Sequence, residues 1–222
     1  MCIWQSRLLN RISFLGKTVL MKNRRILYFL KYPEPGKVKT RLAKTLGNEA
    51  ACRAYRDLAV KNFRTLASLD QEGIESVIVF DPPDKEREIR EWLPAACYFA
   101  QQGEDLGGRL HSAFQRAFDQ GAETALALGS DTLGLKPELI SKAFDELENY
   151  DVVLGPAKDG GYYLIGLSRL QPLLFQSIPW STADVFSTTL ARIKEIGLSC
   201  YLLPELDDLD EIKNLETRRI FL

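Results

Sequence analysis

Residues 26–42 read ILYFLKYPEPGKVKTRL, an apolar run that stops at two prolines and passes into a basic segment. Residues 26–32 are rich in strand-forming side chains, and Pro33 and Pro35 end that run. A short helix is then predicted over residues 40–47, closed by a glycine. A strand that leads directly into a helix is the repeating unit of an α/β fold.

The same alternation continues toward the C-terminus. Further strands are predicted at 76–80, 97–101, 124–128, 152–155, 162–166 and 199–203. Further helices are predicted at 85–93, 106–118, 137–147, 183–196 and 209–218. Asn48 is expected to cap one more helix, whose apolar face holds Cys52, Tyr55, Ala59, Phe63 and Leu66. The pattern predicts a three-layer α/β/α sandwich around a mostly parallel sheet, with candidate ligand sites at the carboxyl ends of the strands.

Length and composition fit one globular domain. The chain has 222 residues, of which 45% are apolar and 27% charged, so whole-chain disorder, collagen and coiled coil are excluded. No run of eighteen apolar residues exists, so no membrane-spanning helix is expected. Residues 1–47 hold 11 Lys and Arg against the single acid Glu34, although the net charge is only −1. This asymmetry indicates a local anion site, not a nucleic-acid surface.

The cysteines and the histidine exclude two kinds of site. Cys2, Cys52, Cys97 and Cys200 form no CxxC pair, and His111 is the only histidine. A structural zinc site needs four clustered ligands, and a Ser–His–Asp triad would depend on a histidine predicted to lie on a helix face. Widely spaced cysteines favour free thiols in a reducing compartment, so a cytoplasmic location is expected.

The first 21 residues are interpreted as an extension that does not belong to the core. They contain basic residues and no acid, and four apolar residues recur at helical spacing: Leu8, Ile12, Leu15 and Val19. They could be an organelle transit peptide, or translated upstream sequence with Met21 as the true start, which is the favoured interpretation. Residues 22–222 then form the single domain.

The basic segment after the first strand is a candidate phosphate-binding loop. Lys37, Lys39 and Arg41 alternate beside Gly36 and a predicted helix start, where unpaired N–H groups and the helix dipole favour anions. The segment matches neither the Walker A pattern nor GxGxxG. The alternative is a solvated basic turn, and the position after the first strand favours phosphate binding.

A second candidate is Gly129-Ser130-Asp131-Thr132, which follows the predicted central strand. Two small residues let a ligand approach, and one carboxylate is enough to help hold a magnesium–diphosphate. The alternative is a cap on the next helix, but Pro137 places that helix start several residues later.

The third candidate, residues 155–166, contains Lys158-Asp159-Gly160-Gly161 between two predicted strands. Asp-Gly between apolar runs is a hairpin signal, but glycines that admit a ligand and an aspartate that accepts hydroxyl hydrogen bonds suit a polar acceptor equally well.

Two further segments are less specific. Asp208 and Glu211 have the spacing of a helix capping box, which is favoured over a metal role for this acidic run. Arg109 lies in the first turn of a predicted helix, within a Gly-rich segment that could touch a substrate.

Together these motifs resemble the radical-SAM/selenodomain-associated transferase family of bacteria and archaea. The resemblance rests on residues 31–46, 106–110, 129–131 and 155–166, and it extends from Arg25 to the C-terminus. That family is similar to the GT-A nucleotide-diphospho-sugar transferases and, more distantly, to the guanylyltransferases of molybdopterin and F420 cofactor synthesis. The sequence departs from the family pattern at Leu133, Glu211 and Asn214, and the last two departures bear on the C-terminal metal position.

The resemblance implies a GT-A-like transferase that uses Mg²⁺ or Mn²⁺. It implies nucleotide binding by Lys37, Lys39, Arg41, Arg109 and Ser130, metal binding by Asp131, Asp208 and Asp210, catalytic roles for Asp131 and Asp159, and acceptor binding by Gly160, Gly161 and Tyr162. The expected partners are a nucleotide or nucleotide-sugar and a small-molecule acceptor. Two alternatives stay open: a nucleotidyltransferase that releases pyrophosphate, and a non-catalytic nucleotide-sensing module.

Overall fold

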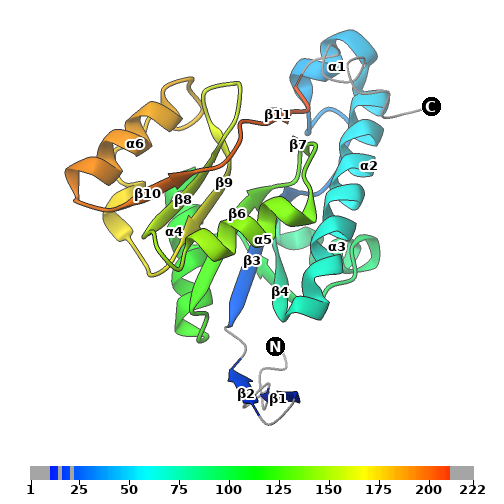
Figure 1. Ribbon diagram of the computed structural model, residues 1–222. Helices are drawn as coiled ribbons and strands as arrows, with labels where there is room; N and C mark the ends of the chain where they lie inside the picture. The colour runs from blue at the N-terminus through cyan, green and yellow to red at the C-terminus, as the bar shows by residue number, and fades with distance from the viewer. Residues whose placement is uncertain (1–10, 15–16, 21–22, 211–222) are drawn as a thin grey trace.

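The computed structural model describes residues 11–14, 17–20 and 23–210, and its main element is a seven-stranded sheet (Figure 1). The strand order is β10-β8-β9-β6-β3-β4-β5. The strands are β3 (Arg24–Lys31), β4 (Ile74–Asp81), β5 (Cys97–Ala100), β6 (Thr124–Gly129), β8 (Val152–Pro156), β9 (Tyr162–Leu167) and β10 (Cys200–Leu202). Of these, β9 runs antiparallel to β6 and β8, and the other neighbouring pairs are parallel. The predicted α/β fold with a mostly parallel sheet is confirmed.

Helices cover both faces of this sheet. They are α1 (Thr40–Leu46), α2 (Asn48–Ala67), α3 (Glu86–Trp92), α4 (Leu106–Asp119), α5 (Pro137–Glu146) and α6 (Val185–Glu195), with 3₁₀ turns η1 (Ser68–Glu72), η2 (Pro83–Lys85) and η3 (Pro172–Phe175). Apolar side chains of α2, α3 and α5 pack on one face, and those of α4, α6 and η3 pack on the other. The arrangement is the predicted three-layer sandwich.

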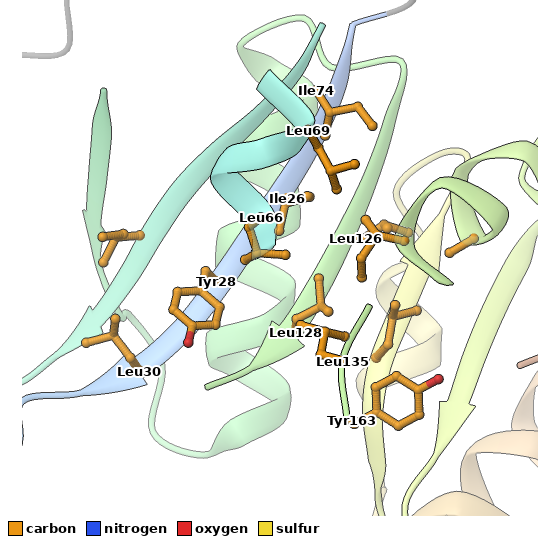
Figure 2. Close-up of a cluster of buried hydrophobic side chains, with 14 of the residues drawn as sticks. Ile26, Tyr28, Leu30, Leu66, Leu69, Ile74, Leu126, Leu128, Leu135 and Tyr163 are labelled. Atoms are coloured by element: carbon orange, nitrogen blue, oxygen red, sulfur yellow. The ribbon is translucent and has the colours of Figure 1, made fainter. Parts of the chain in front are cut away.

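The central strand β3 shows why the sheet has two cores. Ile26, Tyr28 and Leu30 alternate onto the face covered by α2 and α5, together with Leu126 and Leu128 of β6 (Figure 2). The intervening Leu27 of β3 joins the opposite core. Each such side chain contributes roughly 1.5–3 kcal/mol when it is fully buried, so both faces of the strand stabilise the sheet.

Two arginines at the start of β3 have structural partners. The guanidinium of Arg25 is fully buried and donates to the carbonyls of Ala117 (3.0 Å) and Gln120 (2.8 Å) at the C-terminal end of α4. A cation is favourable there because helix carbonyls concentrate negative potential. Arg24 pairs with Asp145 and Glu148. Part of the basic excess at the N-terminal end therefore stabilises the fold and does not belong to an anion site.

The expectation of helical spacing near the N-terminus is wrong for the described residues. β1 (Arg11–Phe14) and β2 (Lys17–Leu20) form an antiparallel hairpin that is separate from the seven-stranded sheet (Figure 1). Two short strands can satisfy backbone groups by pairing with each other, which apolar spacing alone does not reveal.

Two capping expectations also need correction. Gly47 occupies the N-cap of α2 and Asn48 is its first helical residue. Asp208 lies in the short strand β11 (Asp207–Asp208), which pairs antiparallel with β7 (Thr132–Leu133), so it does not cap a helix. Beyond Asp210, the predicted helix over 209–218, with Glu211 and Asn214, lies outside the described residues. Within the part of the chain that is described, no helix is long and apolar enough to cross a membrane.

Candidate functional site

Several sequence motifs meet at one edge of the sheet. β3 and β6 are parallel neighbours, with Phe29 opposite Gly129, so the basic loop and Asp131 both leave the sheet at its carboxyl edge. Because β9 is antiparallel to β8, the turn over residues 157–161 lies at the same edge. The chain after β10 crosses this edge and brings β11 to β7, next to α1 (Figure 1).

Local packing holds the C-terminal segment in place. Leu209 is fully buried with Leu42 of α1 and Leu133 of β7, and its N–H donates to the carbonyl of Asp131 (3.0 Å). Asp208 and Asp210 flank Leu209 on either side. The apolar anchor therefore fixes two carboxylates beside Asp131.

These carboxylates surround the ammonium of Lys39. Its Nζ contacts Oδ2 of Asp131 and donates to Oδ1 of Asp210 at 2.9 Å, and the side chain is only 10% exposed. Burial alone would lower the pKa of Lys39, but Asp131 and Asp210 raise it well above its ordinary value. Lys39 is therefore a permanent cation between two acids from distant parts of the chain.

Asp208 completes the acidic cluster, a name used below for Asp131, Asp208 and Asp210. Its Oδ1 is buried and has no hydrogen-bond partner among the described residues. Burial, followed by the charges of Asp131 and Asp159, raises the pKa of Asp208 to about 7. Lys39 thus pairs with two of the three carboxylates, and Oδ1 of Asp208 stays without a partner in the described part of the chain.

The other two cations of the basic loop are exposed to solvent. Lys37 is 74% exposed and pairs with Glu34 at 2.6 Å, while Arg41 is 72% exposed and reaches Asp210 at 3.5 Å. Between them, Val38 turns inward against Cys52 and Tyr55 of α2. The structure therefore places one predicted cation inside the acidic cluster and leaves two at the solvent side of the same loop.

Ser130 has a supporting position. It is buried, and its hydroxyl shares a 2.9 Å hydrogen bond with the hydroxyl of Tyr55. The side-chain amide of Asn62 donates to the carbonyls of Ser130 (3.2 Å) and Thr132 (2.8 Å). These contacts from α2 hold the turn after β6 in position.

Sequence reasoning missed Tyr55 and Asn62 as parts of the site. The available signal was the position of Asn62, a polar residue within the apolar face of α2, buried to 2% exposure. A buried amide is expected to have hydrogen-bond partners, and here those partners are the carbonyls that position Asp131.

The turn over residues 157–161 is a tight hairpin connection, as one of the two interpretations expected. Oδ1 of Asp159 accepts a hydrogen bond from the N–H of Gly161 (2.9 Å). Gly160 has φ +88°, and a Cβ there would lie 2.1 Å from the carbonyl oxygen of Ala183. The close contact with Ala183 is thus enough, without any ligand, to require glycine at position 160.

Residues around this turn link it to the acidic cluster. Lys158 pairs with Asp207 of β11 at 2.5 Å, and its N–H donates to the carbonyl of Leu206. The ring of Tyr162 packs edge-on against Trp180 at 6.4 Å between centroids, and burial raises the pKa of its hydroxyl. Asp159 remains exposed and is close enough to influence Asp208 electrostatically.

Arg109 lies on the other side of the central strand. Its guanidinium donates to Oε1 of Gln101 (3.2 Å) and lies 3.7 Å from Asp81 at the end of β4. It lines a small polar cavity with Gln101, Ser112 and Arg116. Arg109 is therefore separate from the acidic cluster, with β3 between the two.

The donor set of the acidic cluster fits a hard divalent cation. Carboxylate oxygens are the ligands that Mg²⁺ and Mn²⁺ prefer, and Oδ1 of Asp208 is a buried oxygen that has no hydrogen-bond partner within the described part of the chain. Among the described residues, no three acidic, histidine or cysteine side chains are already arranged to hold a metal. The Lys39 ammonium lies between two of the carboxylates in this arrangement.

Comparisons with known proteins place the chain in a family. The family model described as "Uncharacterized protein conserved in bacteria (DUF2064)" matches residues 65–182. A crystal structure from Desulfovibrio desulfuricans G20, named a "putative nucleotide-diphospho-sugar transferase", is 38% identical over 90% of this chain and 88% of its own, with a TM-score of 0.83. No curated protein matches the sequence.

More distant structures share the fold. The 4-diphosphocytidyl-2C-methyl-D-erythritol synthase of Anaerococcus prevotii DSM 20548 is 10% identical over 88% of this chain and 96% of its own, with a TM-score of 0.57. The glucosyl-3-phosphoglycerate synthase of Mycobacterium tuberculosis, in a complex with Mn²⁺ and UDP, is 10% identical over 84% of this chain and 71% of its own, with a TM-score of 0.50. At this identity the likeness concerns the fold alone.

Proposed function

This chain belongs to the DUF2064 family of proteins conserved in bacteria, and from that membership we propose that it is a metal-dependent transferase acting on a nucleotide or nucleotide-sugar. The observation that carries the proposal is the meeting of Lys39 with Asp131, Asp208 and Asp210 at the carboxyl edge of the sheet. In open α/β sheets this edge is where ligands bind. We also propose that the chain is one of the radical-SAM/selenodomain-associated transferases, which its motifs resemble.

In this proposal Asp131, Asp208 and Asp210 hold Mg²⁺ or Mn²⁺. The metal, when bound, supplies positive charge that stabilises a diphosphate leaving group. Lys37 and Arg41 face solvent beside it and would contact phosphate oxygens through charge-assisted hydrogen bonds. Tyr55, Ser130 and Asn62 keep the turn carrying Asp131 in position.

The acceptor side is proposed for the turn at Asp159, Gly160 and Gly161 with Tyr162. Asp159 is exposed, and one of its oxygens is already held by the N–H of Gly161, which fixes the orientation of the carboxylate. A fixed carboxylate can accept a hydrogen bond from an acceptor hydroxyl and orient it for attack. Arg109, on the far side of β3, is proposed to contact the nucleotide away from its phosphates.

Binding can be tested with a thermal-shift panel of nucleotides and nucleotide-sugars, each with and without Mn²⁺. A ligand present at a hundred times its Kd should add about 2.7 kcal/mol of stability. We expect a diphosphate or triphosphate ligand whose effect is larger with Mn²⁺. If no nucleotide stabilises the protein under either condition, the proposal is wrong.

The products then identify the bond that is broken. Glycosyl transfer releases a nucleoside diphosphate, whereas nucleotidyl transfer releases pyrophosphate. Both reactions place growing negative charge on a diphosphate, so the same arrangement of cations serves either one. Nucleotide binding without turnover over a broad acceptor panel would indicate a sensing module.

A further inference from the structure

Lys39 is engaged with carboxylates, although its loop was expected to bind phosphate. Its Nζ hydrogen-bonds to Asp131 and Asp210, and its side chain is 10% exposed, whereas Lys37 and Arg41 of the same loop are 74% and 72% exposed. An ammonium buried between two carboxylates cannot at the same time meet a phosphate oxygen from solvent.

The backbone of Lys39 is in an unfavourable conformation. Its φ of 47° and ψ of 46° are left-handed, a conformation that is unfavourable for a residue with a side chain. Such strain persists only where the surroundings hold the residue in place. The Lys39 carbonyl accepts the hydrogen bond of the Ala43 N–H (2.9 Å), and the side chain adds its two carboxylate contacts, so loss of those contacts would remove part of what holds this conformation.

The charge of Lys39 does not satisfy the acidic cluster. The Lys39 ammonium lies among the three carboxylates, the exposed Arg41 reaches only Asp210 at 3.5 Å, and Oδ1 of Asp208 remains buried without a partner in the described chain. A divalent cation brings twice the charge and accepts oxygen ligands from several directions. It would need the oxygens of Asp131 and Asp210 that Lys39 occupies.

We propose that Lys39 and the divalent cation compete for the acidic cluster, so that metal binding releases the Lys39 ammonium to join Lys37 and Arg41 on the phosphate side of the loop. In the metal-free protein Lys39 pairs with Asp131 and Asp210. With metal bound, three cations instead of two face the nucleotide. This inference rests on the proposed metal site. It adds that metal binding increases the positive charge at the phosphate side of the loop by releasing Lys39.

Wild-type protein allows a direct test by limited acetylation of lysines, read by mass spectrometry at each residue. Without metal, Lys39 should react slowly because it is buried and held in the charged form. Saturating Mn²⁺ should raise its reactivity several-fold, while Lys44 of α1, which is exposed in the structure, should react equally in both conditions. If Lys39 stays protected at saturating Mn²⁺, the inference is wrong.

A second test compares Mn²⁺ affinity by electron paramagnetic resonance. Lys39→Met removes the competing charge and keeps the length of the side chain, so Mn²⁺ should bind about 5- to 150-fold more tightly than to wild type, the usual range of coupling between sites. Lys44→Met makes the same charge change on the exposed surface and should leave the affinity unchanged. If Lys39→Met fails to fold, acetylation of the wild type decides.

The outcomes separate this inference from the proposed function. If wild type and Lys39→Met bind Mn²⁺ equally, the competition is refuted and the metal site stands. If neither protein binds Mn²⁺, with or without nucleotide, the metal site itself is refuted and the competition with it. Tighter binding to Lys39→Met together with metal-dependent exposure of Lys39 supports both.

Discussion

At the scale of single residues, Asp131 is held from two sides that have different roles. Tyr55, Ser130 and Asn62 fix the turn behind it, and Lys39 contacts its carboxylate in front. The first group is buried and determines position, and the second contact is ionic and can be exchanged. Substitutions at Asp131 should therefore change binding more than folding.

Asp131→Asn should abolish the Mn²⁺-dependent part of nucleotide binding. It keeps the shape of the side chain and removes its charge. Stability without ligand should change by less than about 1 kcal/mol, because the weakened contact with Lys39 is offset by less repulsion with Asp208 and Asp210. Nucleotide titration with and without Mn²⁺ measures this. Asp145→Asn, a surface carboxylate paired with Arg24, is the control, and equal Mn²⁺ enhancement in both variants would remove Asp131 from the site.

Asp208 should make the stability of the metal-free protein depend on pH. Its pKa is raised to about 7 in the folded protein, whereas an unfolded aspartate titrates near about 3.9. Between these values the folded state binds more protons than the unfolded state, so the free energy of unfolding should fall as pH rises from about 4 to 7, and level off above.

Urea unfolding across this pH range, in the presence of a chelator, measures the effect. The steepest slope should approach about 1.4 kcal/mol per pH unit from this group. Asp208→Asn cannot ionise and should lack this part of the pH dependence. A wild-type stability that rises with pH over the same window, by an amount absent from Asp208→Asn, would contradict the prediction.

The sequence allowed part of the site to be predicted, for an identifiable reason. Lys39 and Asp131 follow strands, and the rule that ligands bind at the carboxyl edge identifies such residues without knowledge of the tertiary structure. The carbonyl partners of Asn62 and the contact between Lys39 and Asp210 could not be predicted, because they join residues far apart in the chain. Local patterns do not contain that information.

At the scale of elements, the chain from β8 to β11 is fixed by close backbone contacts. The turn carrying Asp159 packs against the start of α6, where the N–H of Phe186 donates to the carbonyl of Gly160 (2.9 Å). The strand β11 is held by pairing with β7. Helices and β-strands with a strong apolar period were predicted closely, whereas β7 and β11 were missed because each is two residues long and exists only through the other.

Gly160→Ala should destabilise the protein by roughly 3 kcal/mol. The new Cβ would lie 2.1 Å from the backbone oxygen of Ala183, and the positive φ adds strain. Gly197→Ala is the matched control, because Gly197 also has a positive φ (+71°) but no described atom lies within 4 Å of the new Cβ. It should lose only about 1 kcal/mol. Chemical denaturation of both variants checks the difference, and equal losses would show that packing at Ala183 has no effect.

At the scale of the whole molecule, the seven-stranded sheet and the N-terminal hairpin are independent. β1 pairs with β2, and neither pairs with a strand of the main sheet. The three-layer architecture could be predicted because strand–helix alternation leaves few ways to bury both faces of a sheet. The hairpin could not be predicted, since the spacing of its apolar residues fits more than one type of secondary structure.

Deleting residues 1–20 should leave the melting temperature within a few degrees of the full chain. The described part of this segment satisfies its backbone hydrogen bonds within itself, so its removal uncovers no strand of the main sheet. Differential scanning fluorimetry of the two proteins measures the shift. A collapse of soluble yield after the deletion would show that the segment contributes to the core.

The separation along the chain of the groups around Lys39 has a consequence for biosynthesis. Asp131 and Asp210 lie 92 and 171 positions away from Lys39. During translation, strands β3 to β6 can pair long before the segment that carries Asp208 and Asp210 leaves the ribosome, since chains emerge at about 5–20 residues per second. A nascent chain can therefore possess most of its scaffold while it still lacks the acidic cluster, which is complete only after the segment that carries Asp208 and Asp210 has been synthesised.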